Sequence, residues 1–410
     1  MHYINRISFL SIKYLLQHFP CVAILGARQV GKTTLLKQIF PESPFFDLEK
    51  QADYQRIQAD PDFFFSQYSE PIIIDESQIL PNIFSALRVA IDNKRAVNGR
   101  YLISGSSSPE LLRHINESLA GRIAIFHLQG FSLDESWEIM ENPLYTYLKE
   151  KDFQAITRLK PHITSQQLLK SCLMGAYPEP FLKHQENPDI FQLWMNNYLQ
   201  SYIQRDVRNV FPGLNIQNYH RFVAMMARAS GQILNASEFA RSLDISQPTV
   251  KFYFQIADGT FVWRMLPSYQ KNMTKRLVKM PKGHMRDSGL LNFILKNTNL
   301  EELQTHPLFG RIWESFIIEE MIKGFNDRLI PVTSYYYRTG NHAEIDLILE
   351  GPFGVLPIEI KSGVTLPERS LTVLKQFVKD HQLSLGVVIN NAQEVCWLSE
   401  HILQLPAGCL

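Results

Sequence analysis

The residues best suited to chemistry lie near the N-terminus, where two glycines, a lysine and a hydroxyl occur at a fixed spacing. Gly26 is followed five positions later by Gly31, and then by Lys32 and Thr33. Glycines at this spacing let the main chain turn tightly and point its amide hydrogens at phosphate oxygens. The lysine is then placed to reach the β and γ phosphates, and the threonine hydroxyl to ligate Mg²⁺. The pattern predicts an ATP-binding phosphate loop formed by Gly26, Ala27, Arg28, Gln29, Val30, Gly31, Lys32, Thr33 and Thr34.

The segments on either side of this loop are those that the motif requires. Residues 21–25 form a continuous apolar run, which is typical of a buried parallel strand. Residues 32–40 have a helical pattern that ends at Pro41. A helix that starts at the loop presents the positive end of its dipole to the same anion. The alternative is a chance glycine loop before a structural helix, which this strand–loop–helix context disfavours.

A pair of carboxylates follows another apolar run. Residues 72–74 are all isoleucine, and Asp75 and Glu76 come directly after them. The end of such a strand is where the Mg²⁺-side aspartate of a phosphate-loop protein belongs. We therefore expect Asp75 to hold the metal, directly or through water, and Glu76 to orient or deprotonate the attacking water. The alternative is that both residues only end a strand and cap the next turn.

Two further candidates lie downstream of the acidic pair. Ser104, or Ser106 two positions later, follows an apolar strand and is a candidate for sensing the γ-phosphate. Arg122 is a candidate arginine finger, a side chain that stabilises charge developing on the phosphoryl group. If Arg122 acts between subunits, the protein must form a homo-oligomer. The alternatives are ordinary loop serines and a surface or salt-bridging arginine.

Together these segments resemble the AAA+-type ATPases of prokaryotes. The resemblance covers nearly the whole chain. It implies ATP binding more strongly than it implies a particular biological role. It implies an AAA+-like parallel sheet, then a helical and winged-helix region, and then a C-terminal domain of unknown function. The matching segments are residues 26–34, 73–78 with Pro81, 104–107, 119–122, 175–179, 202–207 and 286–289.

The order of strand-like and helical segments predicts an α/β protein with several domains. Strands alternate with helices up to about residue 140, the next ninety residues are mainly helical, and strands return after residue 303. We expect a P-loop ATPase domain at residues 1–140, a helical lid-like region at 141–230, a winged-helix-like region at 231–300 and a nuclease-like α/β domain at 301–410.

The middle of the chain has a helix-turn-helix pattern. Residues 237–243 and 247–254 are predicted as short helices joined by a tight turn, with Pro248 in the first turn of the second helix. The exposed start of the second helix carries Ser246, Gln247, Thr249 and Lys251. A basic cluster follows that suits a wing gripping DNA phosphates, with Lys271, Lys275, Arg276, Lys279, Lys282 and Arg286. The alternative is a protein partner, because such units also serve protein contacts.

A second constellation lies near the C-terminus. Asp346 is on one predicted strand, and Glu359 and Lys361 lie on one face of the next. If the two strands are adjacent, these side chains converge, and Glu314 on the preceding helix completes the set. Two carboxylates can hold Mg²⁺, and a lysine beside them can activate a hydroxide for attack on a phosphodiester.

This C-terminal set resembles the restriction-endonuclease-like PD-(D/E)xK site. Asp346, Glu359 and Lys361 match that pattern, whereas Ala343-Glu344 stands in place of its Pro-Asp lead-in. One alternative is a pair of edge strands with surface ion pairs. Another is a nuclease-like fold that binds DNA without cutting it.

Composition limits the remaining possibilities. The chain has 410 residues, of which 45% are hydrophobic and 20% charged, and a net charge of +1, so gross charge does not indicate a polyanion binder. Its 4 cysteines form no CxxC pair, which argues against a zinc site or a disulfide scaffold. The N-terminal residues lack the apolar stretch and the small-residue cleavage site that are typical of a signal peptide, and the sequence has no run of about 18 apolar residues. We expect a cytoplasmic protein without a membrane span.

The combined prediction is a Mg²⁺-dependent AAA+-type ATPase that couples its nucleotide state to a DNA or protein partner. One rival is a metal-dependent DNA nuclease regulated by ATP. Another is a nucleotide-switched DNA-binding protein without significant turnover.

Overall fold

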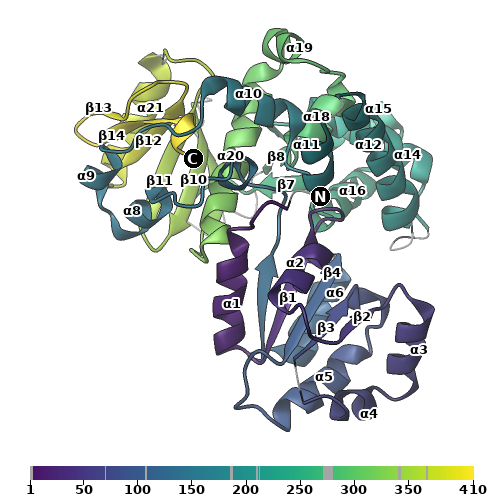
Figure 1. The fold of residues 1–410 in the computed structure, drawn as a ribbon. Coiled ribbons are helices and arrows are strands. Elements are labelled where there is room, and N and C mark those ends of the chain that lie inside the picture. Colours follow the sequence, from purple (N-terminus) through teal and green to yellow (C-terminus); the bar gives the residue numbers. More distant parts are fainter. Residues whose placement is uncertain are drawn as a thin grey trace. The chain divides into compact units, whose positions relative to one another are not determined.

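The computed structural model describes residues 3–69, 71–106, 109–184, 188–208, 211, 213–270, 280–339, 343–365 and 368–410 (Figure 1). The chain divides into two compact units. Unit 1 comprises residues 1–130 and 259–261, and unit 2 comprises residues 131–258 and 262–410.

Unit 1 is built on a parallel five-stranded sheet with the strand order β2-β3-β4-β1-β5. Strand β4 lies between β1 and β3, so the carboxyl ends of these three strands meet at one edge. Ile24 pairs with Ser104, and Ile74 with Ile103. The predicted parallel sheet is confirmed, and β5 is a strand that the sequence pattern did not indicate. The strands are β1 (Cys21–Gly26), β2 (Phe45–Asp47), β3 (Ile72–Asp75), β4 (Tyr101–Ser106) and β5 (Ile123–His127).

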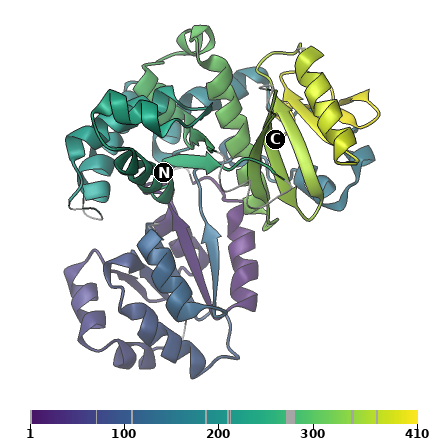
Figure 2. The ribbon, with the colours of Figure 1, turned by 180° about the vertical axis from the view of Figure 1, so that it is seen from behind.

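Helices cover both faces of this sheet (Figures 1 and 2). Alternate strand residues such as Ala23, Ile74 and Ile103 form one buried cluster with side chains from α3, α4, α5 and α6. Helices α1 and α2 pack against β1 and bury Ile12 and Leu36 completely. The helices are α1 (Ser8–His18), α2 (Lys32–Ile39), α3 (Gln51–Ala59), α4 (Pro61–Ser66), the 3₁₀ turn η1 (Ser77–Ile79), α5 (Ile83–Asp92) and α6 (Pro109–Leu119).

Unit 2 begins with a helical stretch. Its helices are capped by local side chains: Ser132 and Thr164 each form a capping box with the residue three positions later. The helices are α7 (Leu133–Ser136), α8 (Leu144–Glu150), α9 (Phe153–Ile156), α10 (Ser165–Met174), α11 (Pro178–His184), α12 (Pro188–Ser201), the π-helix η2 (Tyr202–Val207) and α14 (Ile216–Arg228).

A small three-stranded antiparallel sheet follows, with the order β6-β8-β7. Its strands are β6 (Gln232–Ile233), β7 (Trp263–Leu266) and β8 (Lys282–Met285). Helices α15 (Ala236–Leu243) and α16 (Gln247–Gly259) lie between β6 and β7 in the chain, which confirms the two predicted helices. The Ser246 hydroxyl accepts the Thr249 amide and so caps α16.

The C-terminal part of unit 2 is a mixed six-stranded sheet with the order β13-β14-β12-β11-β10-β9 (Figure 2). Strands β9, β10 and β11 are antiparallel neighbours, and β11, β12 and β14 run parallel. The strands are β9 (Thr333–Arg338), β10 (Glu344–Gly351), β11 (Gly354–Ile360), β12 (Gly386–Asn390), β13 (Cys396–Ser399) and β14 (Ile402–Pro406). The helices are α18 (Ser288–Leu295), α19 (Leu300–Thr305), α20 (Phe309–Asp327), α21 (Glu368–Asp380) and the 3₁₀ turn η3 (Ala407–Cys409).

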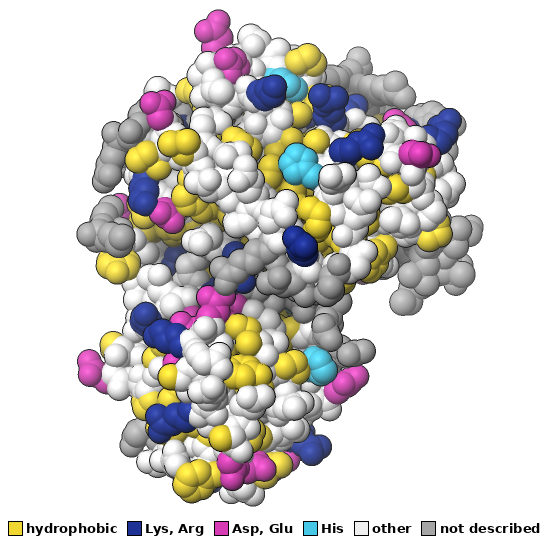
Figure 3. Space-filling model, turned by 90° about the vertical axis from the view of Figure 1, so that its right-hand side faces the viewer, with side chains coloured by type: hydrophobic (Ala, Val, Ile, Leu, Met, Phe, Trp, Pro, Cys, Tyr) yellow, Lys and Arg dark blue, Asp and Glu magenta, His cyan; other side chains and the backbone are white. Residues whose placement is uncertain are grey.

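Two general features of the surface bear on the partner. Among the described helices, none is both long and apolar enough to cross a membrane. On the face shown in Figure 3, Lys and Arg side chains are interspersed with Asp, Glu and hydrophobic ones. Among the described residues, this face therefore presents no broad surface of one charge.

Candidate functional site

The phosphate loop joins β1 to α2, and its two glycines meet different physical demands. A side chain on Gly26 would place its Cβ 2.1 Å from the carbonyl oxygen of Leu128, so only glycine fits between the two chains. Gly31 has a φ of 93°, in the left-handed region that favours glycine, and it directly precedes the first turn of α2. The loop therefore has the shape that the motif requires, with its amides gathered at the start of a helix.

Lys32 is held against the loop by main-chain oxygens. Its ammonium group donates to the carbonyl oxygen of Gly26 at 3.1 Å and to that of Ala27 at 2.9 Å, and the side chain is buried. A cation fixed inside the loop in this way is positioned for the phosphate oxygens of a nucleotide. Of the other loop residues, Arg28 lies 3.6 Å from the Glu49 carboxylate, and Gln29 has a φ of 66°.

Asp75 lies beside the loop at the end of β3, as predicted. Its carboxylate accepts a hydrogen bond from the Thr33 hydroxyl at 2.6 Å and another from the Ser104 hydroxyl. The three side chains come from different elements: Thr33 from the first turn of α2, Asp75 from the end of β3 and Ser104 from β4. Hydroxyl and carboxylate oxygens are the ligands that Mg²⁺ prefers, so the residues present fit a magnesium ion held by Thr33 and Asp75.

Glu76 follows Asp75 in the left-handed conformation, with a φ of 55°. Its carboxylate accepts hydrogen bonds from the Gln78 amide at 2.5 Å and the Ser106 hydroxyl at 3.3 Å, and its main-chain amide donates to Ser104. Ser104 is therefore in contact with both members of the acidic pair. Backbone strain of this kind, together with two side-chain partners, fixes the direction of the carboxylate.

Arg122 is not brought to the loop of its own subunit. It directly precedes β5, whose first residue pairs with Cys21 at the opposite end of β1 from Gly26. At about 3.3 Å per residue, the length of β1 separates Arg122 from the loop by more than 15 Å. Its guanidinium pairs with Asp92 at 2.7 Å, and this hydrogen bond lowers the pKa of the Asp92 carboxyl.

The C-terminal set is assembled as the sequence predicted. Asp346 on β10 lies opposite Glu359 on β11, because Leu347 pairs with Ile358. The Lys361 ammonium lies 2.7 Å from Glu359 and 3.5 Å from Asp346, and the Ile360 amide donates to Asp346 at 2.8 Å. Glu359 and Asp346 are both buried.

A residue outside the predicted set completes this cluster. Lys282, at the start of β8, is only 3% exposed, and its ammonium lies 2.5 Å from Glu314 and 3.8 Å from Asp346. Burial alone would lower the pKa of Lys282, but Glu314 and Asp346 raise it above the ordinary value. Burial raises the pKa of Glu314 to about 7, although Lys282 opposes this shift.

These contacts decide whether the C-terminal set suits a metal ion. Lys361 belongs to the predicted set, but a second ammonium group, that of Lys282, also lies against its carboxylates and joins Glu314 to Asp346. No three described His, Cys, Asp or Glu side chains are grouped so as to hold a metal. In this arrangement the residues do not fit the Mg²⁺ site of a nuclease.

The predicted DNA-gripping wing is wrong for Lys282, one of the two basic residues of the wing that the structure describes. Lys282 is buried in the cluster above, and Arg286 lies 3.8 Å from Asp258 and donates to the Trp263 carbonyl oxygen at 3.0 Å. The buried Lys282 is therefore not available to a phosphate, and the Arg286 guanidinium, which is 17% exposed, is already engaged by Asp258 and the Trp263 carbonyl oxygen. The other members of the cluster, Lys271, Lys275, Arg276 and Lys279, lie outside the described residues.

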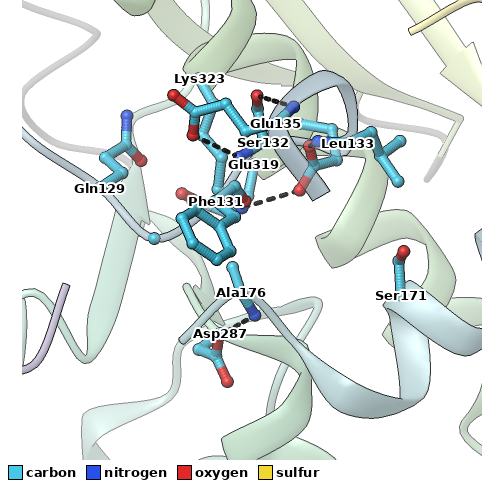
Figure 4. Close-up of polar contacts among 12 residues, drawn as sticks. Gln129, Phe131, Ser132, Leu133, Glu135, Ser171, Ala176, Asp287, Glu319 and Lys323 are labelled. Atoms are coloured by element: carbon cyan, nitrogen blue, oxygen red, sulfur yellow. Dashed lines mark hydrogen bonds and ion pairs between the residues drawn. The ribbon is translucent and has the colours of Figure 1, made fainter. Parts of the chain in front are cut away.

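A further polar cluster surrounds the start of unit 2 (Figure 4). The Lys323 ammonium, on α20, donates to the Phe131 carbonyl oxygen at 3.1 Å, and Glu320 accepts the Leu133 amide at 2.8 Å. The Asp287 carboxylate accepts the Ala176 amide at 2.7 Å. Two segments that contributed to the resemblance, residues 175–179 and 286–289, thus meet in one hydrogen bond.

Three parts of the chain match models of known domain families. Residues 18–137 match the family model of an AAA domain, and residues 165–301 and 309–410 each match a domain of unknown function (DUF8612 and DUF4143). The Walker-type ATPase PABY2304 of Pyrococcus abyssi is 16% identical, with 70% of this chain and 94% of that chain covered and a TM-score of 0.43.

Two relatives that match over most of this chain come from mycobacteria. The chain is 30% identical to the uncharacterized proteins Mb2031c of Mycobacterium bovis and Rv2008c of Mycobacterium tuberculosis, over 96% of its own length and 81% of theirs. The chain therefore belongs to the same family as these two proteins, and its N-terminal unit is an AAA-type P-loop ATPase domain.

Proposed function

We propose that unit 1 binds ATP together with Mg²⁺ and hydrolyses it, and that the nucleotide state controls a DNA or protein partner of unit 2. The observation that carries the proposal is the direct contact of Asp75 with Thr33 and Ser104 beside the phosphate loop. Such a contact places a carboxylate and a hydroxyl at the start of the helix where the phosphates bind.

Each residue of the site has a distinct role in this proposal. The loop amides and the Lys32 ammonium bind the phosphate oxygens, and Thr33 and Asp75 hold Mg²⁺. When bound, the ion neutralises charge on the β and γ phosphates. Glu76 orients and deprotonates the attacking water, and Ser104 fixes the relative position of Asp75 and Glu76 through its contacts with both.

The Glu76→Gln variant tests hydrolysis separately from binding. We expect it to bind ATP normally but to turn over at least about a hundredfold more slowly, because a general base contributes roughly 10²–10⁴ to a rate. Steady-state phosphate release and ATP binding by calorimetry are the measurements. The matched control is Glu42→Gln, an exposed glutamate outside the site. Unchanged turnover in Glu76→Gln would remove Glu76 from this role, and a wild type without turnover would leave a nucleotide-switched binding protein.

The second part of the proposal concerns the partner that unit 2 binds. The elements α14, β6, α15, α16, β7 and β8 follow one another as in a winged helix, and the first two turns of α16 expose Gln247 and Lys251. This arrangement supports DNA as the partner, read by α16. The position of Arg122, away from its own loop, supports a homo-oligomer in which Arg122 reaches a neighbour's nucleotide.

Stimulation of turnover by DNA tests the choice of partner. We expect double-stranded DNA to raise the rate of phosphate release and the Lys251→Ala variant to lose part of that gain. Lys379→Ala, an exposed lysine near the end of α21, is the control. Mass in solution with and without ATP tests assembly. If neither single- nor double-stranded DNA changes the rate, a protein partner is favoured.

A further inference from the structure

An arginine that belongs to none of the predicted sites donates a hydrogen bond to the main chain of the phosphate loop. Arg6 precedes α1 and is 8% exposed, and one of its guanidinium nitrogens donates to the carbonyl oxygen of Val30 at 2.9 Å. The same nitrogen lies 3.7 Å from where a Cβ on Gly31 would stand. The guanidinium therefore lies directly against the peptide that joins Val30 to Gly31.

This contact determines the direction of a loop amide. A trans peptide is planar, so its carbonyl oxygen and its N–H point in opposite directions. When Arg6 holds the Val30 oxygen, the Gly31 N–H must point away from Arg6. In a phosphate loop, the amides on that side bind the phosphate oxygens. Gly31 has no side chain to fix its own conformation, so an external hydrogen bond has most effect at this position.

The other terminal nitrogen of Arg6 contacts the chain where it leaves unit 1. It donates to the Gln129 carbonyl oxygen at 2.7 Å and lies 3.5 Å from that of Gly130. Gly130 is the last residue of the first segment of unit 1, and the next residue, Phe131, belongs to unit 2. One planar guanidinium thus joins the phosphate loop to the residues that follow β5, which is possible because arginine presents its donors in a rigid fork.

The residues that come directly after Gly130 are also held by hydrogen bonds. Within unit 2, Lys323 donates to the Phe131 oxygen and Glu320 accepts the Leu133 amide, both from helix α20 (Figure 4). The same helix carries Glu314 of the C-terminal cluster. A change in the direction of the chain at Gln129 and Gly130 would therefore act on residues that α20 holds.

We propose that Arg6 is a positioning residue of the nucleotide site, which orients the Val30–Gly31 peptide for phosphate binding and ties the loop to the residues that lead into unit 2. The inference rests on the proposed binding of ATP. It adds a route by which a bound nucleotide affects the chain beyond unit 1. Arg6 does not touch the nucleotide in this proposal and is not a catalytic residue.

The experiment compares Arg6→Met with a matched arginine elsewhere in unit 1. Arg100 is 6% exposed and also donates to a main-chain oxygen, that of Ala90 at 3.1 Å, but it precedes β4 at the opposite end of the sheet from the loop. Arg100→Met therefore reports the loss of a buried arginine without loss of the loop contact. Arg6→Lys keeps the positive charge but loses the planar guanidinium that contacts the loop and Gln129 together. ATP affinity with Mg²⁺ is measured by calorimetry on the full chain, with the thermal unfolding midpoint as the test of folding.

The expected results separate positioning from general stability. We expect Arg6→Met to weaken ATP binding by about tenfold or more, the effect of losing a charge-assisted hydrogen bond. Arg100→Met should change the affinity by less than about threefold even where its unfolding midpoint falls as far. Arg6→Lys should lie between Arg6→Met and the wild type.

Hydrogen exchange tests whether Arg6 links the phosphate loop to the residues that follow β5. In the wild type and in Arg100→Met, ATP should slow amide exchange in the peptide that covers residues 126–133. In Arg6→Met at saturating ATP, that slowing should disappear. If Arg6→Met keeps both the affinity and the exchange response of Arg100→Met, the inference is overturned. If the wild type itself binds no ATP, it is the proposed function that fails.

Discussion

Two regions of this chain combine lysines with carboxylates, and they use them differently. In unit 1, Lys32 donates to the main-chain oxygens of Gly26 and Ala27, and Asp75 accepts from the hydroxyls of Thr33 and Ser104. In unit 2, the ammonium groups pair directly with buried carboxylates, Lys282 with Glu314 and Lys361 with Glu359.

The two regions differ in whether a ligand can replace the present partners of their charged side chains. A neutral carbonyl or hydroxyl partner can be replaced by a phosphate or a metal ion with a gain in electrostatic energy. A lysine buried against a carboxylate cannot be displaced without leaving an uncompensated charge, which is costly. We infer that the loop of unit 1 is built to receive a charged ligand, whereas the cluster of unit 2 is complete without one.

The largest effect should come from removing the loop lysine. Lys32→Ala should weaken ATP binding by more than about a hundredfold, because it removes the charge that faces the phosphates. Lys361→Ala, which removes a lysine from the other region, should leave ATP affinity unchanged. Calorimetric titration with ATP and Mg²⁺ measures both. Normal affinity in Lys32→Ala would contradict the assignment of the loop.

The next effect concerns the stability of unit 2. Above pH 7, where the Glu314 carboxyl is ionised, Lys282→Met should destabilise it by about 3–5 kcal/mol, the usual cost of leaving a buried carboxylate without its partner. The double variant Lys282→Met with Glu314→Gln should recover part of that loss, because no buried charge is then unpaired. Thermal unfolding is the measurement, and Lys379→Met, on the surface of α21, is the control.

Metal binding by the carboxylate–lysine cluster of unit 2 would contradict this difference between the two regions. Mn²⁺ titrated into the Asp75→Asn variant without nucleotide should find no site in unit 2, and the wild type should cut no DNA. Binding of Mn²⁺ that disappears on Asp346→Asn would show that the lysines do give way to a metal. The nuclease interpretation would then stand.

A smaller effect should appear with pH. Burial raises the pKa of Glu314 to about 7. The folded state then holds a proton that the unfolded state releases near pH 4.5, so stability is greatest below that pH and falls as the pH rises towards 7. The unfolding midpoint of unit 2 in the wild type should decrease between pH 5 and 7.5, and that of Glu314→Gln should change less. Equal slopes would show that Glu314 does not titrate in this range.

The smallest effect should follow from Arg122→Ala. The side chain pairs with Asp92 at the edge of the sheet remote from the loop, so ATP affinity should change by less than about twofold. Any loss of turnover should then depend on protein concentration, because only a neighbouring subunit's nucleotide is within reach. A concentration-independent loss would argue against action between subunits.

The nucleotide site could be predicted because its parts are local or lie on buried strands. Residues 26–34 are contiguous, and the isoleucines before Asp75 mark a strand buried on both faces. Parallel strands place their carboxyl ends at one edge, which brings Thr33, Asp75 and Ser104 together without further information. Strand β5, with its half-buried pattern, gave no such signal.

Lys282 shows where this reasoning fails. Its basic neighbours in the sequence suggested an exposed wing, but the pairing of β8 with β7 directs it into the carboxylates of α20 and β10. Charge in the sequence does not distinguish a solvated lysine from a buried one, because burial depends on which elements meet.

The sequence alone thus determined the chemistry of the phosphate loop, the acidic strand end and the α/β class, since these depend on residue type and spacing. Only the tertiary structure decided that Arg122 lies away from its own loop, that Lys282 neutralises the C-terminal carboxylates and that Arg6 holds the loop. Arg6 is 24 positions from Val30 and 123 from Gln129. Contacts over such separations follow from packing of the whole unit, and no local pattern carries them.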